Sequence, residues 1–490
     1  MNDSLHVTRL PLRLTADPRR VIARPFLPGS RARIAAILDR VDSLPEAEVS
    51  SILSSVLADY HLRHRNIRGI FRQHYAAAIA WLAGPARTEP DDERRLLAGA
   101  YFSSEYSLES VALFNPSMVL HPDQNGVPRG AARFVLSLRA CGEGHISSIE
   151  FRTGLVDLVD GEPRITLDTP PRFATTPRPV DDALYDKALY VPKLGEMKAH
   201  SEGANPVLRL LDDQFTMSDL KDAIHKCRPK EGASTPFKEL ADSMLWLAHS
   251  NYQLEFSPDL ALSERVIFPV SENESRGIED ARFVRFTHPD GRVEYCATYT
   301  AYNGMRVLPQ LIETTDFRHF KISTLNGRCV QNKGMALFPR KIGDDFVMAA
   351  RLDGENNYLL RSPNIHFWNE SKLLRGPKLP WEFVQVGNCG SPIETDKGWL
   401  LLTHGVGPMR QYWIGALLLD LEDPSRVIGE LSEPLLTPCA DERDGYVPNV
   451  VYSCGPMRYG DHLIIPYAAS DSHTSIATVS LPALLAQLTR

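Results

Sequence analysis

The strongest candidate for acid–base chemistry is the segment 274–282, in which two adjacent carboxylates lie between two arginines. Glu279 and Asp280 are flanked by Arg276 and Arg282, just before a predicted strand. Neighbouring residues on a strand face opposite ways, so we expect only one carboxylate to point into a given pocket. A nearby arginine holds a carboxylate ionised, whereas burial raises its pKa and makes it a proton donor. The alternative is a surface turn held by ion pairs, a frequent role of charge clusters.

A second candidate is a pair of basic residues around an apolar segment. Lys333 precedes it and Arg351 follows it, and Glu355 comes four residues later. The two cations could form an anion site, and Glu355 could act as a base. Equally, Lys333 could extend from a strand edge into solvent, with Gly354 in an ordinary turn.

A third group of candidates lies in the last hundred residues. His404 ends an apolar run that follows Glu394, and a lone histidine there is more often structural than catalytic. Further on, Tyr446 and Asn449 precede a short strand, and Asp471 follows another. Tyrosine near polar groups suits the faces of sugars, although it suits an ordinary β core as well.

The elements that must position these residues differ between the two parts of the chain. Apolar spacing predicts helices over 30–40, 46–65 and 68–83, and again within an insertion at about 206–247. We therefore expect a helical appendage over 1–97 and a mainly β domain over 98–490, with a proline-rich loop or linker at 163–192. The predicted strands are 118–120, 133–139, 282–286, 294–299, 346–350, 399–402, 413–419 and 462–465.

Many short strands separated by turn residues indicate a sandwich, a barrel or a propeller. Two segments resemble variants of one unit: Phe338 precedes a strand that leads to Arg351, and Ser391 precedes a strand that leads to His404. This is weak evidence for a radially repeated blade. In such an arrangement, strand-end residues from different blades would gather in one pocket.

Composition excludes several classes of protein. The 490 residues carry a formal net charge of −7, which argues against nucleic acid as a partner. The sequence has no run of eighteen apolar residues, so no membrane helix is predicted. The first residues do not resemble a signal peptide. Seven scattered cysteines without CxxC or zinc spacing predict reduced thiols, a cytoplasmic location and no metal site.

Together, these segments resemble glycoside hydrolase family 130, the β-mannoside phosphorylases and β-mannosidases. The similarity runs from about Phe114 to Asp471, and its most specific parts are residues 277–282, 333–339, 403–406, 419–425 and 447–451. The resemblance implies a five-bladed β-propeller with an axial pocket. It also implies an inverting mechanism in which Asp280 donates a proton to the glycosidic oxygen, relayed in the phosphorylases through a mannose hydroxyl. Here Ala281 stands where the family usually has proline.

The resemblance implies phosphorolysis of β-1,2- or β-1,4-linked manno-oligosaccharides to mannose 1-phosphate, with inorganic phosphate as co-substrate and no other cofactor. Lys333 and Arg351 match phosphate-binding positions, and Ala350 stands where many members have histidine. Two cations without an anion would be costly to desolvate, which favours phosphate. Arg139 and His404 are further expected phosphate ligands. The expected sugar-binding residues are Asn115, Glu279, Tyr302, Asn303, Tyr446, Asn449 and Asp471.

Two other functions stay open at this point. In a β-mannosidase, Glu355 or Glu394 would activate water, and no phosphate would be needed. In a non-catalytic propeller the pocket would only bind sugar, because fold does not guarantee function. Neither reading predicts a nucleic-acid or membrane partner, and a homo-oligomer through the N-terminal helices is compatible with both.

Overall fold

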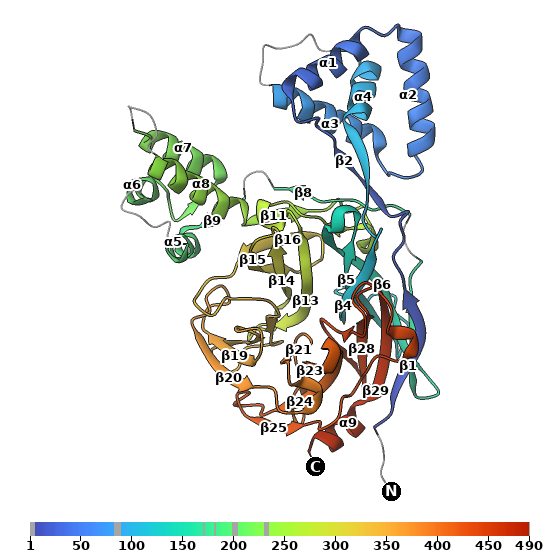
Figure 1. Ribbon diagram of the computed structural model, residues 1–490, viewed down its shortest axis with the longest axis vertical. Coiled ribbons are helices and arrows are strands. Elements are labelled where there is room, and N and C mark those ends of the chain that lie inside the picture. Colours follow the sequence, from blue (N-terminus) through green and yellow to red (C-terminus); the bar gives the residue numbers. More distant parts are fainter. Residues whose placement is uncertain are drawn as a thin grey trace.

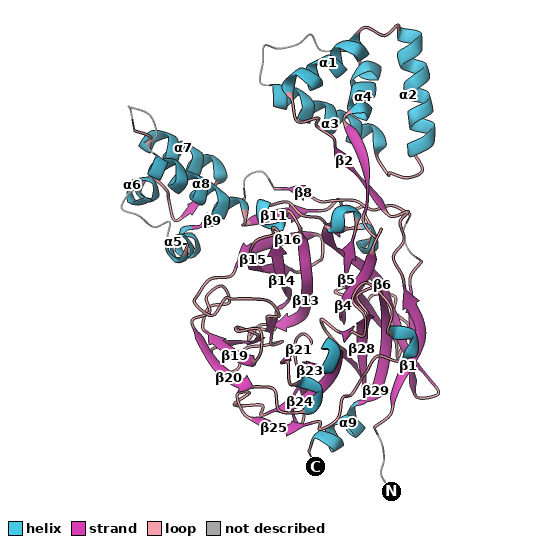
Figure 2. Cartoon of the chain, viewed as in Figure 1, coloured by secondary structure: helices cyan, strands magenta, loops and turns pink. Residues whose placement is uncertain are grey.

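The structure is a computed structural model that describes residues 5–82, 90–169, 172–180, 183–197, 204–229 and 235–489. It is mainly β, with two separate groups of helices at one end of the sheets, as Figure 2 shows. Within the described ranges, no helix is both long and apolar enough to cross a lipid bilayer.

The N-terminal helical group packs around its own apolar core. Its helices are α1 (Arg31–Asp42), α2 (Glu46–Tyr60), α3 (Ile67–Leu82) and α4 (Asp92–Tyr101). Three of them were predicted, and the end of the predicted third helix, Ala83, lies outside the described residues. The fourth was missed, although Asp91 caps it by accepting a hydrogen bond from the backbone N–H of Arg94 at 2.8 Å. A role of this group in oligomerisation stays a prediction.

The first strand corrects the expectation that residues 1–97 are helical. Strand β1 (Val7–Leu14) pairs antiparallel with β29 (His473–Ser480), so it belongs to the C-terminal sheet. Its apolar residues Leu10, Leu12 and Leu14 alternate and pack against a core shared with β4 and β5. That period of two is typical of a half-buried strand. The helices are then connected to the sheets by a ribbon of β2 (Val21–Pro25) and β3 (Ser103–Ser107) (Figure 1).

The main body is a succession of antiparallel strand groups. The first contains β4 (Ala112–Leu120), β5 (Ala132–Cys141), β6 (Ser147–Val159) and β7 (Glu162–Leu167). The second contains β13 (Gly277–Thr287), β14 (Val293–Tyr302), β15 (Val307–Thr314) and β16 (His319–Thr324), and the pair Gly277–Ser147 joins it to the first. The third contains β17 (Ala336–Leu337), β18 (Phe346–Ala350), β19 (Asn357–Ser362) and β20 (Glu370–Arg375).

Two further groups complete the body. One contains β21 (Gln385–Asn388), β22 (Ile393–Thr395), β23 (Gly398–Val406), β24 (Tyr412–Leu419) and β25 (Val427–Glu430). The other contains β26 (Val451–Tyr452), β27 (Met457–Tyr459), β28 (His462–Ala469), β29 and β1. Each predicted strand lies inside one of these observed strands, so the alternating pattern located them correctly.

Two of the strand groups pair the start of one strand with the end of another in the same way. The start of β13 pairs with the end of β14 (Gly277 with Tyr302), and the start of β21 pairs with the end of β23 (Gln385 with Val406). The turns after β5 and β23 also have nearly the same backbone: Gly144 has φ 64° and ψ 17°, and Met409 has φ 56° and ψ 23°. This repetition favours a common structural unit in at least these groups.

The second helical group interrupts the chain between β7 and β13. It contains α5 (Lys187–Glu196), α6 (Ala204–Arg209), α7 (Met217–Cys227) and α8 (Thr235–His249), with a separate core that includes Leu220, Met244 and Leu247. The insertion therefore starts earlier than the predicted residue 206. The proline-rich segment 163–192 was expected to be a loop, but it contains part of β7 and the start of α5, with Pro192 inside the helix. Residues 170–171 and 181–182 of it lie outside the described residues.

A buried ion cluster fixes the start of the N-terminal ribbon to the first sheet. Arg20 lies 2.7 Å from Glu150 and 3.2 Å from Glu109, and Arg152 lies 2.5 Å from Glu109 and 3.1 Å from Glu150. All four side chains are nearly inaccessible to solvent. Burial and the negative charge of Glu150 raise the pKa of Glu109, and the charges of the cluster depend on one another to offset the loss of hydration.

We predict that Arg152→Ala destabilises the fold by about 3–5 kcal/mol, because it leaves two buried carboxylates with a single cation. A urea titration followed by circular dichroism would measure the loss. Arg164→Ala is the matched control, because Arg164 pairs with Asp157 on the surface of the same sheet and exposed pairs contribute little. Equal unfolding midpoints for the two variants would contradict the prediction.

Candidate functional site

Two breaks in strand pairing bring the candidate acid into the site. Asp280 has φ +57° where the β13–β14 register shifts, and Asn115 has φ +49° where the β4–β5 register shifts. Asparagine and aspartate tolerate this left-handed conformation better than most residues. Such bulges redirect side chains, and the Asn115 amide N–H donates to Asp280 Oδ1 at 2.5 Å.

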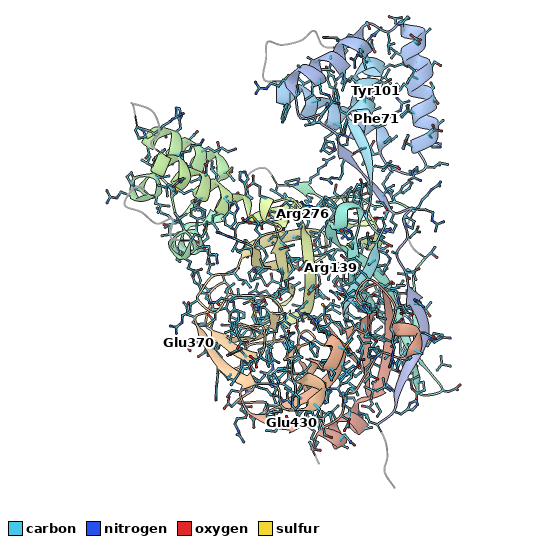
Figure 3. The ribbon with its side chains drawn as sticks, viewed as in Figure 1. Phe71, Tyr101, Arg139, Arg276, Glu370 and Glu430 are labelled. Atoms are coloured by element: carbon cyan, nitrogen blue, oxygen red, sulfur yellow. The ribbon has the colours of Figure 1, made fainter. Side chains whose placement is uncertain are left out.

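The bulge also overturns the expectation that Glu279 and Asp280 face different pockets. One guanidinium, that of Arg139, contacts both: Nη2 donates to Glu279 Oε1 at 2.8 Å and Nη1 donates to Asp280 Oδ1 at 3.3 Å. Lys333 Nζ donates to the other oxygen of Glu279 at 2.5 Å. The side chains do not alternate between the two faces here, because the backbone of Asp280 is in the left-handed conformation. We call Arg139, Glu279, Asp280 and Lys333 the carboxylate cluster; Figure 3 labels Arg139 among the strands of the main body.

The charges of this cluster set the ionisation of its carboxyl groups. Burial alone would raise the pKa of Asp280, but the positive charges of Arg139, Arg282 and Lys333, with the hydrogen bond from Asn115, lower it below its usual value. Asp471 behaves in the opposite way: burial raises its pKa to about 7, and the negative charge of Asp280 adds to the effect. The site therefore holds one ionised carboxylate beside one that is half-protonated near neutral pH.

Two arginines beside the cluster have no acidic partner. Arg282 is buried and donates to neutral groups, Asn388 Oδ1 at 3.0 Å and the Tyr452 hydroxyl at 2.5 Å. Arg351 Nη1 lies 3.4 Å from His404 Nε2. Within the described ranges, neither guanidinium forms an ion pair with a carboxylate. We call Arg282 and Arg351 the arginine pair.

Gly334 separates the two members of the arginine pair. Its φ is +82°, and a side chain there would begin 3.7 Å from Arg282 Nη2 and 4.0 Å from Arg351 Cβ. A glycine therefore leaves space between the arginines. Asp280, Arg282, Lys333 and Gly334 line one small cavity together with Asn332.

His404 joins this site as a neutral group. Burial and the nearby charges of Arg351 and Arg282 lower its pKa well below the usual range, so it does not add a positive charge. A proton on Nδ1 would donate to the carbonyl of Asn388, 3.2 Å away, and leave Nε2 to accept from Arg351. The ring also stacks on Tyr412, with centroids 5.8 Å apart.

The two glutamates suggested as bases do not join the carboxylate cluster. Glu394 is exposed and pairs with Arg340 at 2.7 Å. Its strand partner Trp399 lies five residues before His404 on β23, which is about 16 Å along an extended strand. Glu355 is exposed in the loop after β18, and no contact within the described ranges joins its side chain to the cluster.

Of the remaining expected sugar ligands, Tyr302 contacts the carboxylate cluster. Within the described ranges, the observed contacts of Asn303, Tyr446 and Asn449 are with other residues. Lys333 Nζ lies 5.8 Å from the ring centre of Tyr302. Asn303 accepts hydrogen bonds from two backbone N–H groups of its own turn. Tyr446 is 54% exposed and stacks on His145. The backbone of Asn449, with φ +61°, accepts from the N–H of Tyr412 at 3.1 Å.

Sequence reasoning missed three residues that shape the site. Arg282 was recognised only as a flanking charge, and Asn388 and Tyr452 were not singled out as ligands. Their contacts join positions 106 and 170 residues apart. The available signal in the sequence was an arginine inside a predicted strand. No local spacing shows that these side chains meet.

We predict that replacing Asp471 by asparagine changes how stability depends on pH. The pKa of Asp471 is about 7 in the folded protein and about 4 in an unfolded chain. Between these values the folded state binds more protons, so the wild type loses stability as pH rises toward 7. The melting temperature of Asp471→Asn minus that of the wild type should therefore increase from pH 5 to pH 8. Asp290→Asn, in an exposed turn, is the control; a constant difference for Asp471→Asn would refute the assignment.

Comparison with known proteins extends the resemblance seen in the sequence. The model of glycoside hydrolase family 130, described as beta-1,4-mannooligosaccharide phosphorylase, matches residues 259–490. The chain is 33% identical over 227 residues to 1,2-beta-oligomannan phosphorylase of Thermoanaerobacter sp. (strain X514), covering 45% of this chain and 74% of that protein. It is 30% identical over 230 residues to beta-1,2-mannobiose phosphorylase of Listeria innocua, covering 45% and 63%.

The Listeria innocua beta-1,2-mannobiose phosphorylase has also been solved with beta-1,2-mannobiose. That structure aligns with a TM-score of 0.46 and 21% identity, covering 78% of this chain and 93% of that one. The sequence matches to curated relatives therefore carry the assignment: the chain belongs to glycoside hydrolase family 130 and is an enzyme of that family.

Proposed function

We propose that this protein cleaves β-mannosides with inorganic phosphate and releases mannose 1-phosphate with inversion at the anomeric carbon. The observation that carries this proposal is the arginine pair, two cations without a carboxylate partner beside Asp280. The two relatives named above are phosphorylases of β-1,2-linked mannosides, whereas the family model is described as a β-1,4-mannooligosaccharide phosphorylase, and we leave the linkage open.

The charge balance of the site favours an anionic substrate. Lys333 and Arg139 are already paired with Glu279 and Asp280, whereas the partners of Arg282 and Arg351 among the described residues are neutral groups. Isolated buried cations are costly unless an anion pairs with them. Phosphate offers several oxygens and two negative charges, and arginine binds it through strong charge-assisted hydrogen bonds. We therefore assign phosphate binding to Arg282 and Arg351, with Lys333 beside them and neutral His404 orienting Arg351.

Asp280 is our candidate for the proton donor. In the reaction, a phosphate oxygen bonds to the anomeric carbon, the glycosidic C–O bond breaks, and the leaving oxygen gains a proton that derives from Asp280. The site cations hold Asp280 ionised in the free enzyme. A phosphate dianion on those cations would offset their field and raise the pKa of Asp280. Phosphate binding would then prepare both the nucleophile and the acid.

Sugar recognition is proposed for the residues around the carboxylate cluster. Asn115 and Asp471 present an amide and a carboxyl group close to Asp280, which suits hydroxyl groups of the mannose ring. Tyr302 and exposed Tyr446 offer ring faces farther out. Glu279 is held by two cations, so it would accept hydrogen bonds from sugar hydroxyls without exchanging protons.

We also propose that the strand groups are the five blades of a β-propeller with the site on its axis. The repeated turns after β5 and β23 support this arrangement. So does the meeting of strand-end residues from separate groups, as in the contact of Arg351 with His404. β1 would then complete the last blade, because it pairs with β29.

We predict that Asp280→Asn lowers kcat by about 100-fold or more, because loss of a general acid commonly has that effect. The side chain keeps its shape, so mannoside binding should change little. Steady-state kinetics with mannobiose and phosphate, with folding checked by circular dichroism, would test this. Asp290→Asn serves as the matched control on an exposed turn. Near-normal turnover by folded Asp280→Asn would remove Asp280 from the reaction.

We predict that Arg351→Ala raises the apparent KM for phosphate about 10- to 100-fold and that for the mannoside much less. The reason is that it removes a charged contact made to phosphate alone. Arg340→Ala is the matched control, because Arg340 pairs with exposed Glu394 away from the site. Both variants would be assayed with mannobiose isomers over a range of phosphate concentrations, with mannose 1-phosphate measured as the product.

The same assay distinguishes phosphorolysis from hydrolysis. A phosphorylase needs phosphate and tolerates Glu355→Gln and Glu394→Gln, because phosphate requires no base to become nucleophilic. Phosphate-independent release of free mannose, abolished by Glu355→Gln, would instead identify a hydrolase. That result would overturn our proposal while leaving the role of Asp280 unchanged.

A further inference from the structure

A second cavity, of about 290 Å³, lies where the inserted helices meet the sheet. Its walls come from the segment around the start of α5, from β11 (Tyr252–Glu255) and from β16, and the two sides lie next to each other in Figure 1. The residues that bring polar groups to it include Tyr185, Gln214, Asn251, Gln253, Ser323 and Thr324.

This cavity is distinct from the site around Asp280. In the sheet order β13–β14–β15–β16, three strand spacings separate β16 from the strand that carries Asp280. At about 4.8 Å each, they amount to about 14 Å. The inserted helices that form the other wall lie outside the segments that resemble the family, so the cavity is a feature of this chain's own insertion.

Several polar groups at the cavity have no partner. Within the described ranges, the Tyr185 hydroxyl and the side-chain amides of Gln214 and Gln253 form no hydrogen bond. Tyr185 is otherwise fixed by its ring, which packs on Phe215 with centroids 5.4 Å apart. Polar groups without a protein partner, gathered at a concave surface, are available to a polar ligand.

The lysines at the cavity are paired with carboxylates, and Lys321 Nζ lies 3.6 Å from Glu313. Lys193 Nζ donates to the carbonyl of Leu325 at 2.9 Å and lies 3.1 Å from Glu196. Asp186 caps α5 by accepting from the N–H of Ala188. Burial lowers the pKa of His366 to about 4, so its ring is neutral at neutral pH. The cavity thus offers amides, hydroxyls, tyrosine and the carboxylate of Asp186, a set of hydrogen-bonding groups that suits a neutral polar ligand and disfavours anions.

We propose that this cavity binds one neutral sugar unit, as a second carbohydrate site of the enzyme. Amides and hydroxyls match the donors and acceptors of a sugar ring, and the apolar side chains of Leu184 and Leu189 match its C–H faces. The volume lies at the small end of ligand pockets, about 300 Å³, so it suits a single ring. The choice of mannose as the probe rests on the proposed function, whereas the inference of a neutral polar ligand does not.

Calorimetric titration of mannose into the full chain, without phosphate, would test the proposal. We expect two binding events in the wild type. The double variant Tyr185→Phe/Gln253→Ala should weaken one of them at least tenfold, and Arg139→Ala should weaken only the other. Tyr101→Phe is the control, because Tyr101 is a half-exposed tyrosine of the N-terminal helical group, far from the cavity (labelled in Figure 3). Melting temperatures would show that all variants are folded.

The outcomes separate this inference from the proposed function. A sugar-binding event that Tyr185→Phe/Gln253→Ala weakens while Arg139→Ala does not would support the second site, even if phosphorolysis fails. Mannose binding that the double variant leaves unchanged, or a wild type with a single event lost only in Arg139→Ala, would overturn it. In that case the cavity holds water alone.

Discussion

The site depends on the backbone reversal at Asp280. A regular strand would send Glu279 and Asp280 to opposite faces, and Arg139 could not contact both. The left-handed conformation brings both carboxylates to one guanidinium, and a matching reversal at Asn115 supplies a hydrogen bond from the neighbouring strand group. Backbone strain of this kind persists only where the surroundings fix it, and here ion pairs from other strands do so.

A second constraint is the uneven distribution of charge. Glu279 and Asp280 occupy Arg139 and Lys333, while Arg282 and Arg351 remain with neutral partners. The same cations lower the pKa of Asp280, whereas burial and the negative charge of Asp280 outweigh Arg139 and raise the pKa of Asp471. Two carboxyl groups in one pocket thus differ in ionisation because of their neighbours.

Much of this could be predicted from the sequence, and the failures have physical causes. Apolar periodicity located the predicted strands and three of the N-terminal helices, and the charge pattern at 279–282 contains two carboxylates that the structure brings to one arginine. Apolar periodicity could not locate β1, whose partner lies at the other end of the chain, or α5, which contains Pro192. The sequence does not show how far Glu394 lies from His404, because Glu394 pairs with Trp399 at the opposite end of β23 from His404. Arg282 was undervalued because its partners, Asn388 and Tyr452, are brought to it only by tertiary structure.

The pairing of β1 with β29 has a consequence for how the chain reaches its native state. Val7 and Val479, which are partners in this sheet, are 472 positions apart. During synthesis the first strand leaves the ribosome long before its partner exists, and contacts of such separation form slowly. Leu10, Leu12 and Leu14 must remain without their native cover until the last strands arrive. These leucines of an early segment are therefore among the last apolar side chains of the sheets to be sheltered from water.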